Sequence, residues 1–320
     1  MLCWFRANRA KTGIKTEYLY MVAGIKRQVY FRKAKKMEAQ AFVEMRTIEM
    51  VREVRERHPV IGARSLFYLL KISYMGVNRF EKLLSESDLG VERKRSWIKT
   101  TNSNHRFFKY NNLTNGMALN GMDQLWVSDI TYWVDGQSHY YLMFMLDVYS
   151  RRILGYTASQ NMYAINNLNT FNTSLNIRNR SKFDCLVHHS DKGSQYCSTE
   201  YITALQKAQI TISMAGNSLE NPYAERLNGI IKNDYLMHLD TGSFPKLAKA
   251  LDRAVWLYNH ERPHSELDYM TPIGFEKTVQ ELAVDQRKTM VLHDFRKIPA
   301  NGNGSASPPT ASGGGKGGMD

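Results

Sequence analysis

The sequence predicts an α/β domain built on a mixed β-sheet, preceded by a small all-α region. Apolar residues recur at helical spacing in the N-terminal third, three runs rich in β-branched and aromatic residues begin at Leu125, and short strands and helices alternate after them. A length of 320 residues allows one large domain with a smaller one, or two of medium size.

Residues 1–91 are predicted to form a basic helical DNA-binding region. Residues 17–33, "EYLYMVAGIKRQVYFRK", suit two short helices that meet at Gly24, and a longer helix is predicted over residues 37–57. Pro59 and Gly62 end that helix, and two more are predicted in "ARSLFYLL" and "YMGVNRFEKLLSESDL". Helices with interleaved arginines are typical of helix-turn-helix units, although a basic surface that is merely solvated stays an alternative.

The positive charge is concentrated in the same region. Residues 1–100 hold 22 Lys and Arg against 10 Asp and Glu, whereas the remaining residues hold 21 against 20, within a net charge of +13. Such an excess attracts polyanions, so nucleic acid is the first partner to consider and a membrane surface is the rival. No stretch approaches the ~20 apolar residues of a membrane span and no secretory signal is visible, so we expect a cytoplasmic chain.

Residues 92–121 are predicted to be a polar, Asn-rich linker, and the core is predicted to follow from residue 122 to 280. The runs "LWVSDITYWV", "HYYLMFMLDVYS" and "RRILGYTAS" predict a three-stranded antiparallel meander. Two more strands are predicted in "DCLVHHS" and "ITISMA". The expected helices are "AINNLNTFNTSLNIRN", "TEYITALQKAQ" with Thr199 as cap, "NPYAERLNGIIKNDYL", and "FPKLAKALDRAVWLYNHERPH". Residues 281–320 form a C-terminal extension, predicted to be disordered from about residue 301 because few of its side chains can bury area.

The three cysteines, Cys3, Cys185 and Cys197, are too few and too scattered for a disulfide framework or a closed zinc site. Three acids are more informative. Asp129 lies inside an apolar strand, where an unpaired carboxylate would be costly. Asp191 directly follows a buried strand, and Glu225 lies in the first turns of the helix that starts near Pro222.

Groups at strand ends and helix starts converge on one crevice in an open α/β sheet, so the three acids can meet although 61 and 33 residues separate them. A carboxylate cluster favours hard cations, with Mg²⁺ as the default and Mn²⁺ as its substitute. Two such ions ~3.5–4 Å apart can support an in-line displacement at a phosphodiester. Taken singly, each acid has an equal alternative: an ion pair with an arginine for Asp129, a turn or N-cap role for Asp191, and an exposed first-turn position for Glu225.

Four motifs resemble the integrase-type catalytic core of bacterial insertion-sequence transposases, in the group whose enzyme is encoded in a second, frameshifted reading frame. They are "LWVSDITYW", "HHSDKGSQYCS", "ENPYAERLNGIIKNDYL" and "WLYNHERPHSELDYMTP". Upstream, "HPVIGARSLFYLL" is similar to the group's helix-turn-helix and "KTTNSNH" to its linker, so the resemblance runs from about residue 18 to 277. It implies a ribonuclease H-like core with a five-stranded mixed sheet and flanking helices, and an Asp-Asp-Glu metal triad at Asp129, Asp191 and Glu225.

The resemblance also implies further site residues. His189, Gly193, Gln195 and Tyr196 match the stretch around the second aspartate, and Asn221 and Lys232 match polar positions around the glutamate. Lys232 lies two helical turns after Glu225, so both can face the same DNA; a solvated helix lysine is the alternative. We therefore expect DNA contacts from Gln195, Asn221 and Lys232, and from Arg64 in the helix-turn-helix segment, while His188 and His189 are expected to pack rather than bind metal.

One departure bears on the third acid. The 33 residues between Asp191 and Glu225 are fewer than is usual in the family, which makes Glu220 a competing choice. Glu220 precedes Pro222 and is expected to lie outside the helix, and "AER" around Glu225 fits the family motif better, so Glu225 is preferred.

The function implied is a transposase that binds the terminal inverted repeats of an insertion element, cuts its end with a metal-activated water, and joins the freed 3′ hydroxyl to target DNA, with two Mg²⁺ ions as cofactors. The implied partners are DNA, further copies of the chain on that DNA, and a helix-turn-helix protein from the upstream reading frame, with no membrane; the implied location is the cytoplasm, on the nucleoid.

A catalytically inactive DNA-binding repressor is the alternative that the short spacing favours, and a structure-selective nuclease is another. A retroviral-type integrase is less apt, because the N-terminal region lacks paired His and Cys zinc ligands.

Overall fold

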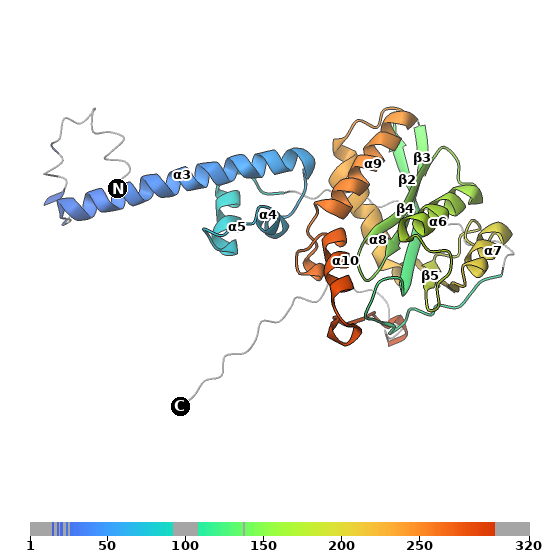
Figure 1. The fold of residues 1–320 in the computed structure, drawn as a ribbon. Helices are drawn as coiled ribbons and strands as arrows, with labels where there is room; N and C mark the ends of the chain where they lie inside the picture. Colours follow the sequence, from blue (N-terminus) through green and yellow to red (C-terminus); the bar gives the residue numbers. More distant parts are fainter. Residues whose placement is uncertain are drawn as a thin grey trace.

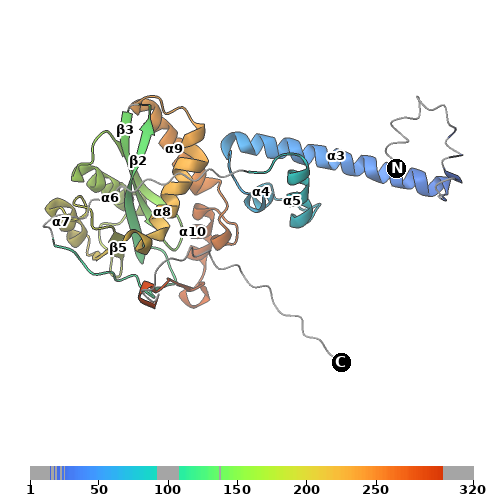
Figure 2. The same ribbon diagram turned by 180° about the vertical axis from the view of Figure 1, so that it is seen from behind.

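The computed structural model describes residues 26–91, 108–136 and 138–297, together with residues 15, 18, 20, 21 and 24. These residues form a helical region and an α/β core that lie side by side (Figures 1 and 2). Cys3, most of the predicted linker and the tail from residue 301 lie outside the described residues.

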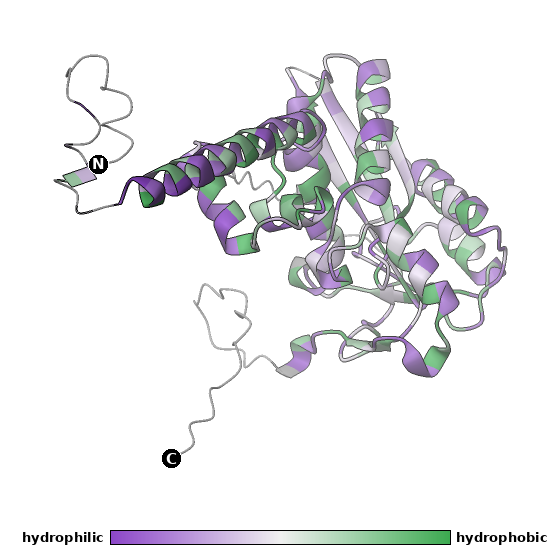
Figure 3. Cartoon of the chain, turned by 60° about the vertical axis from the view of Figure 1, so that its left-hand side comes forward, coloured by the Kyte–Doolittle hydropathy of each residue, from purple (hydrophilic) through white to green (hydrophobic). Residues whose placement is uncertain are grey.

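The helical region consists of α3 (Arg27–Arg57), α4 (Ala63–Leu69) and α5 (Val77–Glu86). Its small core brings together Val51, Ile61, Leu66, Phe80 and Leu84. α3 ends before Pro59, as predicted, but it begins ten residues earlier than the predicted helix over residues 37–57. The second of the two short helices expected around Gly24 is therefore the start of α3, because no Gly or Pro interrupts residues 27–57. Figure 3 shows hydrophilic and hydrophobic residues interleaved along the part of α3 that projects from the core.

The core is built on a five-stranded mixed sheet in the order β4-β3-β2-β5-β6. The strands are β2 (Leu125–Asp135), β3 (Ser138–Asp147), β4 (Ile153–Ser159), β5 (Val187–Ser190) and β6 (Thr211–Met214). β2, β3 and β4 form the predicted antiparallel meander, and β5 and β6 run parallel to β2. The parallel strands are short and buried, as expected when helices cover both faces.

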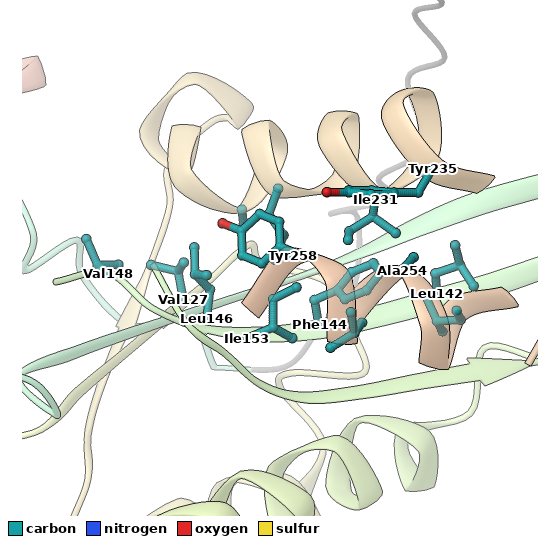
Figure 4. Packing of buried hydrophobic residues seen from close by; sticks show 14 of the residues in the cluster. Val127, Leu142, Phe144, Leu146, Val148, Ile153, Ile231, Tyr235, Ala254 and Tyr258 are labelled. Carbon is teal, nitrogen blue, oxygen red and sulfur yellow. The ribbon is translucent and has the colours of Figure 1, made fainter. Parts of the chain in front are cut away.

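Helices cover the sheet on two sides. Residues of α6 (Ala164–Arg178) and α7 (Thr199–Lys207) pack in one apolar cluster, and residues of α8 (Pro222–Gly229) and α9 (Phe244–His260) pack in the other. Figure 4 shows the second cluster, where Phe144 and Ile153 of the sheet lie under Ile231, Ala254 and Tyr258. This three-layer arrangement confirms the predicted ribonuclease H-like α/β fold.

The cap of α7 differs from the prediction. Ser198, not Thr199, is the N-cap, and its hydroxyl accepts a hydrogen bond from the Tyr201 backbone N–H at 3.4 Å. Ser198 holds the extended backbone conformation that a cap requires, whereas Thr199 is already the first helical residue. Two adjacent hydroxyl residues made the sequence ambiguous by one position.

α8 continues without a break into a π-helical segment, Ile230–Tyr235, followed by the 3₁₀ turn Leu236–His238. A π-helix is wider than an α-helix, with i→i+5 hydrogen bonds, and such segments are rare and frequent at functional sites. The predicted single helix over this stretch is thus present, but its geometry changes after Gly229. Its buried residues, Ile231 and Tyr235, pack in the same cluster as α9.

Ordered pairing extends beyond the predicted limits of the core. β1 (Ala118–Leu119) pairs antiparallel with β7 (Met290–Val291), beyond α10 (Pro272–Glu281). The domain boundaries at residues 121 and 280 stay predictions. None of the helices in the described ranges is long and apolar enough to cross a membrane.

Candidate active site

Asp129 and Asp191 lie side by side because β2 and β5 are parallel neighbours. Val127 pairs with His189 across the two strands. Asp129 is two residues further along β2, and Asp191 is two residues further along the other chain segment, directly after β5 ends at Ser190. Neighbouring strands are ~4.7–4.9 Å apart, so the register alone places these two acids next to each other.

Glu225 reaches the same edge because the start of α8 is fastened to β2. The buried side chain of Asn221, the N-cap of α8, donates a hydrogen bond from Nδ2 to the Ser128 carbonyl oxygen at 3.0 Å. Glu225 lies one turn later, and Asn228 donates from Nδ2 to Asp129 Oδ2 at 2.8 Å. Two amide side chains thus hold the helix against the strand on either side of the glutamate.

The three carboxyl groups influence one another. Burial, followed by the negative charges of Asp191 and Glu225, raises the pKa of Asp129 to about 8, although hydrogen bonds from the Ile130 backbone and from Asn228 oppose this rise. Glu225 is exposed on α8, yet partial burial of its carboxyl group raises its pKa as well. The structure therefore brings the predicted acids within electrostatic reach, in an environment that resists their full ionisation.

This donor set fits hard divalent cations. Carboxylate oxygens are their preferred ligands, and bound cations would offset the repulsion that raises the pKa of Asp129. Among the described residues, however, no group of three or more His, Cys, Asp and Glu side chains is placed so that it could hold a metal ion as it stands. The acids are neighbours rather than a finished coordination sphere.

Lys232 also faces the first aspartate. Its Nζ donates a hydrogen bond to Thr131 Oγ1 at 3.2 Å. Burial lowers the pKa of Lys232, while the charge of Asp129 raises it in part. The predicted DNA-contacting lysine is thus half-buried at the site.

The loop after β5 is shaped by Asp191. The Gly193 backbone N–H donates to Asp191 Oδ1 at 2.9 Å, and a Cβ at Gly193 would lie only 2.9 Å from that oxygen. Gln195 donates from Nε2 to the Met162 carbonyl oxygen at 3.2 Å, which ties this loop to the segment between β4 and α6. Tyr196 is buried beside the acids, and burial followed by the charges of Asp129 and Asp191 raises its pKa well above the usual value.

The two histidines before Asp191 are engaged in packing. His188 Nε2 lies 2.9 Å from Ser128 Oγ and 3.1 Å from the Tyr201 hydroxyl oxygen. His189 contacts Ser213 Oγ through Nδ1 at 2.8 Å and the Glu220 carbonyl oxygen through Nε2 at 3.2 Å. Burial lowers the pKa of both, to about 3 and about 4, so they are neutral supports of the strand.

The carboxylate of Glu220, the competing acid, is held by residues of its own loop and by Asn112. It accepts hydrogen bonds from Asn112 Nδ2 at 2.6 Å, from the Gly216 backbone N–H at 2.8 Å and from Asn217 Nδ2 at 3.1 Å. It lies in the 3₁₀ turn Ser218–Glu220, outside α8. These contacts give Glu220 a structural role and favour Glu225 as the third acid.

The helical region meets the core at Tyr235 and Glu261. His58 is buried between the Tyr235 hydroxyl oxygen, 3.0 Å from Nδ1, and Glu261 Oε2, 3.2 Å from Nε2. Arg64, predicted to contact DNA, is exposed on α4 and donates from Nε to Glu81 Oε1 at 2.9 Å. Sequence reasoning missed His58 as a junction residue, and it missed Asn228, whose signal was its position three residues after Glu225 on one helical face.

The chain matches two models described as "Integrase core domain", over residues 120–217 and 206–272. It is 30% identical over 213 residues to the "Insertion element IS600 uncharacterized 31 kDa protein" of Shigella sonnei, covering 65% of this chain and 78% of that protein. It is 29% identical over 233 residues to the "Transposase for insertion sequence element IS629" of the same species, covering 72% and 78%. A putative transposase for IS986/IS6110 of Mycobacterium tuberculosis is 30% identical over 160 residues, covering 48% and 58%.

Solved structures with a similar fold include the HTLV-2 integrase catalytic core domain in complex with magnesium, with 21% identity and a TM-score of 0.40 over 49% of this chain and 97% of that one. The simian T-cell lymphotropic virus intasome in complex with PP2A regulatory subunit B56 gamma has 17% identity and a TM-score of 0.43, over 79% and 77%.

A mixed sheet whose parallel strands carry neighbouring aspartates, with a glutamate on the adjoining helix, is the arrangement of a ribonuclease H-like integrase core. The chain belongs to the family of bacterial insertion-sequence transposases. The predicted family and fold are therefore confirmed, while the roles of individual residues stay predictions.

Proposed function

We propose that this chain cuts the ends of an insertion element and joins them to target DNA, using divalent cations held by Asp129, Asp191 and Glu225. The observation that carries this proposal is the placement of the three acids: the register of β2 and β5 brings Asp129 and Asp191 together, and Asn221 and Asn228 fix the start of α8, which carries Glu225, against β2. Three neighbouring carboxyl groups that hinder one another's ionisation form a site suited to cations.

The chain's own residues would position the acids and the DNA. Asn221 and Asn228 fix α8 against β2, and Gly193 lets the loop after β5 close around Asp191. Two Mg²⁺ ions, with Mn²⁺ as substitute, would supply charge stabilisation for the attacking and leaving oxygens of a phosphodiester. No covalent intermediate with the protein is required.

The DNA would be held on both parts of the chain. We assign phosphate or base contacts beside the acids to Lys232 and Gln195, and a contact in the helical region to Arg64. Asn221, first expected to contact DNA, is buried and bonded to the Ser128 carbonyl oxygen, so its proposed role is to position α8. The net charge of +13 supports binding of element ends and target DNA. Handling two ends together would require further copies of the chain on DNA, and the family resemblance adds a helix-turn-helix protein from the upstream reading frame.

The test measures strand cleavage and joining with labelled element ends and Mg²⁺. Asp129→Asn and Glu225→Gln are expected to lower both activities roughly 100-fold or more, because several kcal/mol of charge stabilisation are lost. DNA binding should be retained in both. Glu220→Gln is the matched control, and it should keep strand joining within about tenfold of the wild type, because its carboxylate bonds to its own loop.

Full activity of Asp129→Asn would refute the assignment of the triad. Loss of activity in Glu220→Gln together with full activity in Glu225→Gln would exchange the third acid. A wild-type chain that binds element ends but yields no Mg²⁺-dependent products would identify it as an inactive DNA-binding repressor.

A further inference from the structure

A cavity with a volume of about 170 Å³ lies where α4 of the helical region meets α8 and the segment after α9. Its lining includes Ser65 of α4, Tyr223 and Arg226 of α8, Arg151 between β3 and β4, and Arg262 and His264 after α9. The volume is more than ten times the ~10–15 Å³ that accommodates one water molecule. The last two residues belong to the motif "NHERPHSEL", to which the proposed catalysis gives no role.

Three guanidinium groups surround this cavity. Arg226 donates to Glu266 Oε1 at 2.9 Å, and Arg151 donates to the other oxygen of the same carboxylate. Arg262 donates to Asp234 Oδ2 at 2.6 Å. Two carboxylates thus face three arginines, which leaves an excess of one positive charge.

Two polar atoms of the lining have unmet hydrogen-bonding capacity. Arg151 is 7% exposed, and its Nη1 is buried without a hydrogen-bond partner. His264 Nε2 is likewise buried without a partner. An acceptor that reached the charged Arg151 Nη1 would satisfy it, and a buried charged donor without a partner costs more than the about 1–3 kcal/mol of a neutral one.

The field in the cavity is positive. Burial, followed by the charges of Arg262, Arg151 and Arg226, lowers the pKa of His264 well below its usual value. The guanidinium of Arg151 also stacks over the ring of Tyr223 at 4.3 Å, which fixes the orientation of its fork. The guanidinium of Arg151 is therefore held in place before any ligand binds.

We propose that this cavity is a binding site for a phosphate group of the DNA backbone, held by Arg151, Arg226 and Arg262. Planar guanidinium forks match phosphate oxygens in a bidentate way, and a tetrahedral anion accepts hydrogen bonds from the several directions in which these arginines lie. In the free chain the Glu266 carboxylate accepts the hydrogen bonds of Arg226 and Arg151. An entering phosphate would take over these two hydrogen bonds and displace Glu266.

The position of the cavity favours DNA as the source of the phosphate. Arg226 directly follows Glu225 in α8, so the cavity and the proposed catalytic acids share this helix. Ser65 brings in the helical region, whose basic helices are proposed to hold element ends. A backbone phosphate bound here would set the distance between the bound end and the cut, and this assignment rests on the proposed function.

The experiment uses the full chain in EDTA, so it is independent of cleavage. One arm measures the thermal midpoint with inorganic phosphate against chloride at equal ionic strength, and the other measures binding of an element-end duplex at several salt concentrations. Arg226→Gln is the main variant because its side chain is exposed and the fold does not depend on it. Lys207→Gln, with the same loss of charge on α7 across the sheet, is the control.

Arg226→Gln should bind the duplex about tenfold more weakly than Lys207→Gln, with a salt slope smaller by about 0.9, the value for one lost phosphate contact. Inorganic phosphate should raise the midpoint of the wild type, less so that of Arg226→Gln. In Glu266→Gln, inorganic phosphate should raise the thermal midpoint more than in the wild type, because the competing carboxylate is gone. If the Glu266 ion pairs were purely structural, the phosphate-induced rise would not increase.

Equal binding of DNA by Arg226→Gln and Lys207→Gln would overturn the assignment to the DNA backbone, and a response to inorganic phosphate alone would then identify a site for free phosphate. No phosphate response in the wild type or in Glu266→Gln would overturn the anion site itself. A wild-type chain that binds no end DNA would instead refute the proposed function, and the phosphate arm would still report on the cavity.

Discussion

Two sets of three acids lie within the same core, and they differ in what balances them. Asp123, Asp147 and Glu276 surround the side chain of Arg178, with nitrogen–oxygen distances of 2.6, 3.2 and 2.7 Å. The other set is the proposed active site, where Asp129 accepts hydrogen bonds from the neutral amide of Asn228 and the backbone of Ile130. The first set is thus balanced by the guanidinium of Arg178, a cation that belongs to the chain itself.

The pKa values show the consequence of this difference. Burial raises the pKa of Glu276, but the hydrogen bonds and charges of Arg178 and Arg152 outweigh it and leave that pKa lowered. Asp147, buried more deeply, keeps a raised pKa in spite of Arg178. At Asp129 both burial and the neighbouring acids raise the pKa, to about 8. The first set is therefore balanced by Arg178 within the folded chain, whereas Asp129 of the second set keeps its proton up to about pH 8 when no cation is bound.

The largest effect is expected from breaking the balanced set. Arg178→Gln leaves three acids around a neutral side chain, and removing one partner of a buried ion pair costs about 3–5 kcal/mol. The free energy of unfolding, measured with urea at neutral pH, should fall by that amount. Arg180→Gln, at an exposed arginine two residues on, should change it by no more than about 0.5 kcal/mol. A similar small change in both variants would mean that Arg178 does not hold the acids together.

Replacing Asp129 in the proposed active site is expected to stabilise the metal-free chain, whereas replacing Arg178 destabilises it. Unfolded Asp129 releases its proton near pH 4 and the folded chain releases it near pH 8, so the folded state holds an extra proton between these values. Without metal, the free energy of unfolding should therefore decrease as the pH rises from about 4 to about 8. Asp129→Asn should remove this decrease and be more stable than the wild type by up to about 5 kcal/mol at pH 8.5 in EDTA, because each unit of pKa shift corresponds to about 1.4 kcal/mol.

Thermal unfolding of both chains in EDTA and in Mg²⁺ provides the measurement. Mg²⁺ should stabilise the wild type at pH 8.5 and stabilise Asp129→Asn less. Asp285→Asn, at an exposed acid outside the site, should follow the wild type. Parallel pH profiles for Asp129→Asn and the wild type would contradict the raised pKa.

A smaller effect is expected at His58, which is buried without a full charge at the junction of the two regions. Burial lowers its pKa to about 4, although Glu261 opposes this. Unfolded histidine binds a proton near pH 6.5, so the contribution of neutral His58 to stability is present above that pH and is lost as the pH falls towards 4. His58→Gln should reduce the loss of stability over this range by about 1–2 kcal/mol, measured by urea unfolding at pH 7 and 4.5. An unchanged loss would assign the acid sensitivity to other groups.

The sheet and the acids were predictable from local patterns, whereas the contacts between distant segments were not. An aspartate within an apolar strand and another directly after a buried strand are visible in "LWVSDITYW" and "LVHHSD". The partner of His58 is Tyr235, 177 residues away, and no periodicity links the two. The start of α3 was missed because the aromatic residues before residue 37 resembled a separate short helix.

The choice between Glu220 and Glu225 shows where sequence reasoning needs coordinates. Both acids precede or begin the same helix, and spacing alone left them as competitors. Only the hydrogen bonds of Glu220 to Gly216 and Asn217 show that its carboxylate faces its own loop. The three arginines of the cavity were hidden for the same reason, since they come from three separate segments.

The π-helical segment Ile230–Tyr235 sets the relative orientation of two residues on either side of the same continuous helix. Glu225 lies before it and faces the sheet edge, and Tyr235 lies at its far end and contacts His58 of the helical region. Deleting one residue from the segment would rotate everything after it by about 100° relative to Glu225. Either Glu225 or Tyr235 would then turn away from its partner, so this segment holds the sheet edge and the junction with the helical region in a fixed relative orientation.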